Sequence, residues 1–250
     1  NVALGHNALG ANTTADDNTA VGRSSLGSNT TGTRNTAVGR KALEQNNSSD
    51  NTAVGHYAAT ATTTGQYNVA IGKASLESNT TGTYNVAIGV AALEDNTSQD
   101  ENTAVGYQAL KDATSTANTA VGYICLRDNT SGGYNTAIGR EAGRDNTTGN
   151  FNTFLGRSAG EQCTTGGYNI CIGNDSGRAG QPGGTVVTSS NNTSDARDKA
   201  DITDFTHGLS WINKLRPVTY RWDERINYSD DLSVVPDGTH KKPRLNLGLL

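Results

Sequence analysis

The stretch NVAIG, residues 68–72, decides the fold because its pattern recurs along most of the chain. Each copy reads Asn, a β-branched residue, a mostly small residue, an aliphatic residue and Gly. The copies begin at Asn1, Asn18, Asn35, Asn51, Asn68, Asn85, Asn102, Asn118, Asn135, Asn152 and Asn169. Their spacing is 17 residues, or 16 before Asn51 and Asn118. Such a period indicates a repeat architecture.

The alternation within each copy predicts a strand, with Val69 and Ile71 on one face and Ala70 on the other. A unit of this length is too short for two packed helices and lacks their apolar stripe. A second mark, as at Ala42-Leu43, and a turn such as Asn79–Gly82 follow in most copies. We therefore expect strand, bend, short strand and turn. Stacked units predict a mostly β protein, a β-solenoid of eleven coils about 50 Å long.

Three repeat positions call for a physical reason. Gly is always fifth, which indicates a positive φ or a close approach that excludes a Cβ. Asn is always first, and stacked Asn side chains form hydrogen-bonded ladders. The third residue is Ala except for Phe154 and Cys171. We expect this small-residue column to face a neighbouring chain across a three-fold axis, with the last two copies marking a wider junction.

Composition excludes several classes of function. Hydrophobic residues make up 33% of the 250 residues, and the net charge of −4 gives no electrostatic case for nucleic acid. No apolar stretch is long enough for a membrane helix, and no signal peptide is recognisable. The four His show no metal-site spacing, so no metal or other cofactor is expected. Cys125 and Cys171 replace small residues, Cys163 lies in a turn, and a disulfide framework is not expected.

The repeats "NTAVGRKAL" and "YNVAIGKASLESNTTG" resemble the head repeats of trimeric adhesins of the YadA type. They also resemble the longer repeats of phage tail fibres. The resemblance covers residues 1 to about 180 and implies a left-handed parallel β-roll assembled as a homotrimer. These coils are longer than the usual family repeat, which suggests an enlarged outer turn. Because the chain opens within a repeat, we expect further residues before Asn1.

The composition changes after residue 180. Residues 181–193 are expected to be a linker, and residues 194–250 a small α+β domain. Leu209, Ile212 and Leu215 have helical spacing before Pro217, and residues 218–226 alternate as a strand. "SDARDK", "LSWINKLRPVTYRW" and "LGLL" resemble the intramolecular chaperone domain of phage fibres and endosialidases, the peptidase S74 family. That resemblance implies further chain after Leu250.

The same resemblance implies a self-cleavage site. It assigns Ser194 as nucleophile, Lys199 as base, and the bond between Thr193 and Ser194 as the one that is cut. A Lys amine can accept the Ser proton once burial lowers the Lys pKa. Without the flanking match, a capping Ser beside a solvated Lys is the better interpretation. Asp195 and Arg197 are expected to orient or pair locally.

The outward sixth position of the repeat is often basic or aromatic: His6, Arg23, Arg40, His56, Lys73, Tyr107, Tyr123, Arg140 and Arg157. Binding of anionic surface glycans is one interpretation of this column, and a solvated face is the other.

Three functions remain open. The first is a phage or phage-like tail fibre, trimeric and in contact with a host-cell glycan or protein receptor and with other tail proteins, located on a virion or outside the cell. Its C-terminal chaperone promotes folding and is at most a single-turnover serine peptidase. The second is a bacterial cell-surface adhesin of the trimeric autotransporter type without enzymatic activity. The third is a polysaccharide-degrading fibre, for which the rod shows no constellation of acids.

Overall fold

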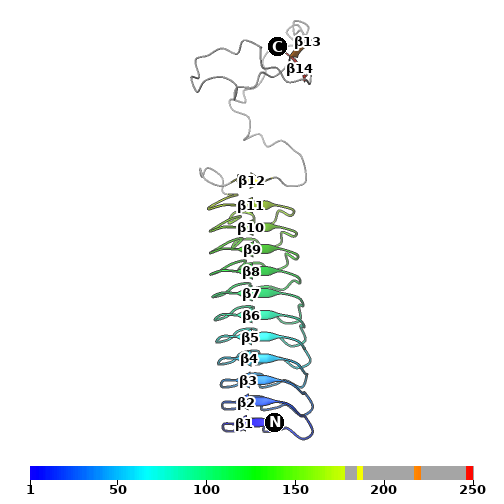
Figure 1. Cartoon of the computed structure of the whole chain (residues 1–250), viewed down its shortest axis with the longest axis vertical. Coiled ribbons are helices and arrows are strands. Elements are labelled where there is room, and N and C mark those ends of the chain that lie inside the picture. Colours follow the sequence, from blue (N-terminus) through cyan, green and yellow to red (C-terminus); the bar gives the residue numbers. More distant parts are fainter. Residues whose placement is uncertain (178–184, 188–216, 221–245, 250) are drawn as a thin grey trace. The chain divides into compact units, whose positions relative to one another are not determined.

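The computed structural model describes residues 1–177, 185–187, 217–220 and 246–249 (Figure 1). The chain divides into two compact units, Asn1–Asn192 and Thr193–Leu250, and each is described by itself. We call residues 1–177 the rod.

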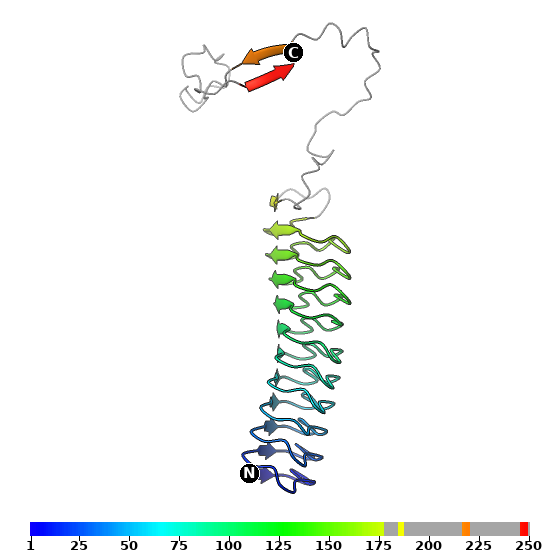
Figure 2. The same cartoon turned by 90° about the vertical axis from the view of Figure 1, so that its right-hand side faces the viewer.

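The rod is a parallel β-solenoid, as the repeat predicts. Each copy of the motif contributes one strand of three residues, and β1 to β11 pair in parallel and in chain order. Figure 1 shows the strands stacked above one another, and Figure 2 shows them along one side of the stack with the turns along the other. The strands are Val2–Leu4 (β1), Thr19–Val21 (β2), Thr36–Val38 (β3), Thr52–Val54 (β4), Val69–Ile71 (β5), Val86–Ile88 (β6), Thr103–Val105 (β7), Thr119–Val121 (β8), Thr136–Ile138 (β9), Thr153–Leu155 (β10) and Ile170–Ile172 (β11). Strand β12, Thr185–Val187, pairs with β11 in the antiparallel sense.

The second mark of the repeat is a turn, so the prediction of a second short strand was wrong. In the third coil, Lys41 and Leu43 have φ of 63° and 50°, which is left-handed backbone. Alternation between left-handed and ordinary residues folds this segment back toward the strand. Its backbone still bonds from coil to coil, because the Leu26 N–H donates to the Ala42 carbonyl at 3.0 Å. The solenoid is thus hydrogen-bonded on both sides with one strand per coil.

The fifth-position glycines satisfy both of the predicted reasons for Gly. Their φ values lie between 113° and 147° from Gly5 to Gly173, a range that other residues rarely adopt. The backbones of neighbouring coils also touch there, because a Cβ added to Gly5 would lie 2.6 Å from the carbonyl oxygen of Gly22. No side chain fits between the coils at this corner.

The first-position asparagines form the predicted ladder, but through the backbone. The Oδ1 atom of Asn68 accepts the backbone N–H of Asn85 at 3.0 Å, and the Asn68 Nδ2 group donates to the Gly82 carbonyl at 2.8 Å. The first of these bonds recurs at every step from Asn1 to Asn169, at 2.8 to 3.0 Å. In most coils the buried Asn therefore joins the next coil to the end of its own coil, while the Asn118 amide donates to Ser115 and Thr116 of the preceding coil.

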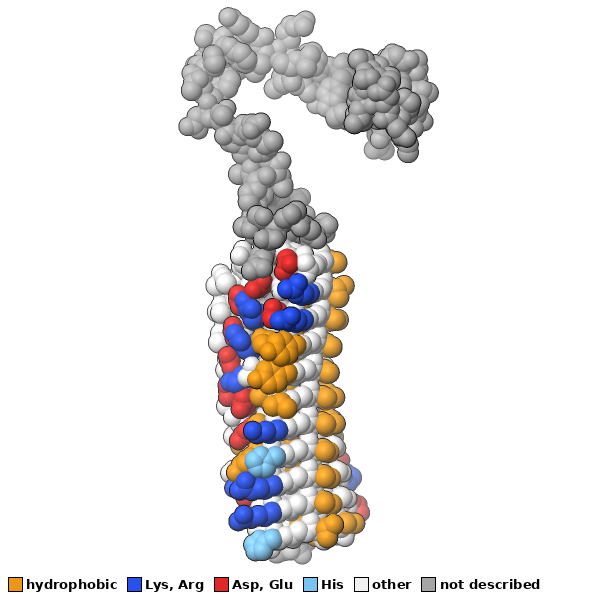
Figure 3. All heavy atoms as spheres, turned by 90° about the vertical axis from the view of Figure 1, so that its left-hand side faces the viewer, with side chains coloured by type: hydrophobic (Ala, Val, Ile, Leu, Met, Phe, Trp, Pro, Cys, Tyr) orange, Lys and Arg blue, Asp and Glu red, His pale blue; other side chains and the backbone are white. Residues whose placement is uncertain are grey.

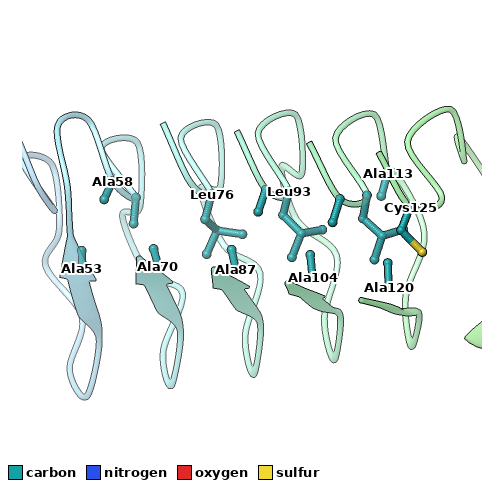
Figure 4. Close-up of a cluster of buried hydrophobic side chains, with 14 of the residues drawn as sticks. Ala53, Ala58, Ala70, Leu76, Ala87, Leu93, Ala104, Ala113, Ala120 and Cys125 are labelled. Atoms are coloured by element: carbon teal, nitrogen blue, oxygen red, sulfur yellow. The ribbon is translucent and has the colours of Figure 1, made fainter. Parts of the chain in front are cut away.

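The third-position alanines line the interior of each coil, which corrects the prediction that they face a neighbouring chain. Ala87 and Ala104 are fully buried, and Figure 4 shows them on the strands, with Leu76 and Leu93 of the facing turn segments across from them. The interior is narrow, since in seven of the eleven coils one Leu from the far wall fills the space beside the strands. Only a small residue fits opposite that Leu.

Phe154 and Cys171 also face inward and compensate for missing leucines. The last three coils carry Gly143, Gly160 and Gly177 where most others carry Leu. The fully buried Phe154 ring occupies this space, because a Cβ on Gly143 or Gly160 would overlap its carbon atoms. The change therefore repacks the same chain and marks no wider junction between chains.

The C-terminal unit contains an antiparallel pair, β13 (Pro217–Tyr220) with β14 (Asn246–Leu249). Strand β13 covers the start of the strand predicted over residues 218–226. The helix predicted from Leu209, Ile212 and Leu215 lies outside the described residues. Within the described ranges the chain forms no helix, and hence none that could span a membrane.

Substitution of one fifth-position glycine tests the importance of the close backbone contact between neighbouring coils. We expect Gly89→Ala to lower the free energy of unfolding by roughly 2 to 5 kcal/mol, since the new Cβ would meet the Gly106 carbonyl and φ is 133°. The matched control is Val90→Ala, at the next residue, which is 44% exposed. Denaturant unfolding of both variants measures the difference. Equal midpoints would show that the corner tolerates a side chain.

Candidate functional sites

The outer sheet face is the surface formed by the second and fourth residues of each repeat, on the side of the strands away from the core. The fourth residues form an aliphatic column: Leu4, Val21, Val38, Val54, Ile71, Ile88, Val105, Val121, Ile138, Leu155 and Ile172. The Ile172 side chain, on a strand paired on both sides, is 45% exposed. The Leu4 side chain, on the first strand of the sheet, is 67% exposed. The second residues are Thr, Val or Ile throughout.

This face differs from ordinary protein surface in its continuity. Neither outward position holds a charged residue in any of the eleven strands. Figure 3 shows an uninterrupted hydrophobic column along the edge of the rod. Monomeric proteins rarely expose apolar patches of this extent, and such patches mark interaction sites. The aliphatic side chains that the sequence placed opposite Ala thus lie outside, where they are available for contact between molecules.

A second column lies directly after the strands. We call it the position-6 column: His6, Arg23, Arg40, His56, Lys73, Val90, Tyr107, Tyr123, Arg140, Arg157 and Asn174. It contains no carboxylate, and its members are exposed or partly exposed, so the prediction that the position points outward is confirmed. Figure 3 shows cationic, histidine and hydrophobic side chains in a row beside the aliphatic column.

Members of the position-6 column contact one another from coil to coil. The Arg40 Nη1 and His56 Nε2 atoms are 3.2 Å apart. The Tyr107 and Tyr123 rings are stacked at 5.3 Å, and the Arg140 guanidinium lies 5.7 Å from the Tyr123 ring centroid. The Tyr123 ring therefore has Tyr107 stacked on it and Arg140 over it. The column presents ring edges, hydroxyl groups and cationic groups to solvent.

Aromatic stacks, which the sequence analysis did not identify, form where the residue before the repeat Asn is aromatic, as it is in five places. Tyr67 stacks on Tyr84 at 5.1 Å, while Phe151 stacks between Tyr134 and Tyr168 at 5.0 Å from each. All five residues have left-handed backbone, with φ near 60°. Stacking offsets part of the cost of this conformation for a bulky residue. The recurring dipeptide Tyr-Asn was the available signal.

The charged residues on the turn side form ion pairs. Arg144 contacts Asp145 at 2.7 Å and the nearly buried Glu161 at 2.6 Å. The hydrogen bond with Asp145 is the largest cause that raises the pKa of Arg144. Lys111 lies 2.9 Å from Asp95, and this hydrogen bond likewise raises the Lys111 pKa. These acids are neutralised in pairs, and their arrangement indicates a structural role.

The cysteines divide into a core residue and a close pair. Cys125 is fully buried in the core, and burial raises its thiol pKa to about 12. Cys163 and Cys171 lie with their Sγ atoms 4.0 Å apart. The packing role predicted for Cys125 and Cys171 is confirmed. The contact with Cys163 was not foreseen, because the two residues belong to successive coils.

The predicted cleavage residues Thr193, Ser194 and Lys199 lie outside the described residues, as do Asp195 and Arg197. Their roles therefore stay predictions. In the described part of the chain, no group of three or more His, Cys, Asp or Glu side chains is placed to hold a metal ion.

Residues 194–245 match the peptidase S74 family, described as chaperone of endosialidase. Comparison with curated proteins and comparison with solved structures both found no match. The match supports the interpretation of this segment as a chaperone domain of the endosialidase type. The resemblance of the rod to adhesin heads stays a prediction.

Proposed function

We propose that the chain is part of a trimeric fibre protein of a phage or phage-like particle, structural and surface-binding, with a C-terminal chaperone that promotes trimer folding. The observation that carries the proposal is a β-solenoid followed in the same chain by the match to the chaperone of endosialidase at 194–245. The fibre lies on the virion or outside the cell. A bacterial surface adhesin is the alternative, and the chaperone match favours the fibre.

Burial of the outer sheet face drives the proposed trimerisation. Eleven aliphatic side chains form a column without charges, and burying them in a neighbour removes apolar area from water. Each chain carries its chaperone segment after the same end of the rod. Assembly around an axis parallel to the rod keeps these segments together, and closed cyclic symmetry leaves no face open. The resemblance to adhesin heads favours three chains.

Charges placed on this face test the trimer. We expect Ile71→Lys with Ile88→Lys to weaken association more than about a hundredfold, because each chain would bury two ammonium groups. Sedimentation velocity of full-length protein measures the assembled fraction, and circular dichroism checks that the rod remains folded. The matched control is Thr81→Lys with Ser98→Lys, in the same two coils at exposed turn positions. Equal assembly of both variants would contradict a role of the sheet face.

The second part of the proposal is release of the chaperone after folding. The Ser194 hydroxyl attacks the Thr193 carbonyl carbon while the Lys199 amine takes its proton, and the amide becomes an ester as the Ser194 amine is freed. Water then hydrolyses the ester, which leaves Thr193 with a carboxylate and Ser194 as a new N-terminus. Burial of Lys199 would supply the neutral amine that this step needs.

Intact mass under denaturing conditions tests this step. We expect freshly expressed full-length protein to separate into two fragments, the second beginning at Ser194, and expect Ser194→Ala and Lys199→Met to remain whole. Ser190→Ala, four residues upstream, is the control and should be cut like the parent. Cleavage of Ser194→Ala at the parent's rate would overturn the assignment, and so would a parent chain that stays intact.

The third part is surface binding by the position-6 column. Its cationic and hydroxyl groups, with no carboxylate among them, favour a linear anionic glycan. Arg23, Lys73 and Arg157 form no ion pair within the described residues, so their charges are available to such a ligand.

Binding to a carboxylated polysaccharide, polygalacturonate, tests the column. We expect Arg140→Gln with Arg157→Gln to weaken binding about tenfold at low salt, and the loss to shrink at high salt. The control, Ser131→Glu with Thr148→Glu, lowers the net charge by the same amount at exposed turn positions. An equal loss of affinity in the control would show that binding depends on the net charge of the protein and not on the position-6 column. No binding by the parent would also contradict the proposal.

A further inference from the structure

The last coils of the rod contain a pair of thiols in contact. Cys163 lies in the turn of the tenth coil and is partly buried, while Cys171 is the central residue of β11 and is 1% exposed. Their Sγ atoms are 4.0 Å apart, close to van der Waals contact. The remaining cysteine, Cys125, lies in the core where its thiol contacts the carbonyls of Ala137 and Ala142. The chain thus has one pair and one isolated thiol.

The packing of these coils makes room for the pair. Cys163 stands where many coils carry the Asn that closes the turn, as Asn146 does through its bond to Gly149. Gly177 provides space beside both sulfur atoms, since a Cβ added there would lie 3.0 Å from Cys171 Sγ and 3.6 Å from Cys163 Sγ. The two sulfur atoms are therefore in direct contact.

The end of the parallel stack also lacks stabilising contacts that other coils have. Three coils carry Gly in place of the core Leu, and Phe154 and Cys171 restore part of that volume. The bond that closes the turn through Asn in other coils is lost at Cys163 as well. A covalent link here would fix the turn of the tenth coil to the strand of the eleventh.

The two thiols differ in reactivity. The hydrogen bond with Cys171 lowers the pKa of Cys163, and the same contact raises the pKa of Cys171. Cys163 is also the more accessible of the two. An external disulfide would therefore meet the Cys163 thiolate first, since the thiolate is the nucleophile in exchange.

We propose that Cys163 and Cys171 form an intrachain disulfide by exchange with a low-molecular-weight disulfide such as oxidised glutathione. The Cys163 thiolate attacks one glutathione sulfur and releases one glutathione thiolate. The Cys171 sulfur, after losing its proton, attacks the mixed disulfide at Cys163 and releases the second. Two protein thiols are oxidised, one glutathione disulfide is reduced to two glutathione molecules, and the sulfurs move from 4.0 Å to about 2.05 Å. The bond would form whether or not the rods assemble, and it requires an oxidising compartment.

Thiol counting on the full-length protein tests the disulfide. After incubation with oxidised glutathione, the protein is quenched with acid, denatured and alkylated. We expect one alkyl group per chain, on Cys125, with the protein lighter by two hydrogen atoms and the 163–171 link found by peptide mapping. Cys125→Ala should form the same link. Cys163→Ser should retain two alkylatable thiols.

Three outcomes would overturn the proposal: alkylation of all three cysteines after prolonged incubation, a stable glutathione adduct on Cys163, or a link between different chains. Hydrogen exchange of Thr153–Gly177 supplies a second measurement on the same samples. We expect at least tenfold slower exchange in oxidised than in reduced protein, reversed by dithiothreitol, and no such change in Cys163→Ser. Equal exchange rates in all samples would show that the disulfide does not stabilise Thr153–Gly177.

Discussion

The rod depends on the approach of one backbone to the next at the glycine that ends each strand. At this corner the coils are so close that a Cβ on one Gly would overlap the carbonyl of the following coil. The Asn ladder, at 2.8 to 3.0 Å per step, holds the other end of the strand at the same separation. Between these two fixed points only three residues remain, which is why each strand is short.

Much of this could be predicted from the sequence because the period is a property of the chain itself. The number of strands, their parallel stacking and the roles of Gly and Asn all follow from equivalent residues at equal spacing. Alternation does not tell which face is inside, however. Ala87 lies in the core and Ile88 on the outer face, the reverse of what hydrophobicity suggests, because Leu76 already fills the narrow interior. Left-handed backbone at Lys41 and Leu43 was also beyond prediction, since neither residue favours it.

The candidate sites likewise divide into those that the sequence predicts and those that only the structure shows. Ser194 and Lys199 were recognised through their motif, and the family match covers the segment that contains them. The contact between Cys163 and Cys171 needed coordinates, because it depends on how the end of one coil meets the strand of the next. The aromatic stacks were visible as a repeated Tyr before Asn, but the ring contacts follow only from the rise between coils.

A closed interior leaves the outer surfaces as the place where the rod acts. The core is filled by Ala, Leu and Phe154, while the aliphatic column and the position-6 column lie side by side outside. The central claim is that the aliphatic column is buried between chains. Cryo-electron microscopy of the assembled full-length protein tests it most directly. The account predicts three parallel rods in register, with β1 to β11 of each facing a common axis. Single rods, or rods whose sheet faces are open to solvent, would contradict it.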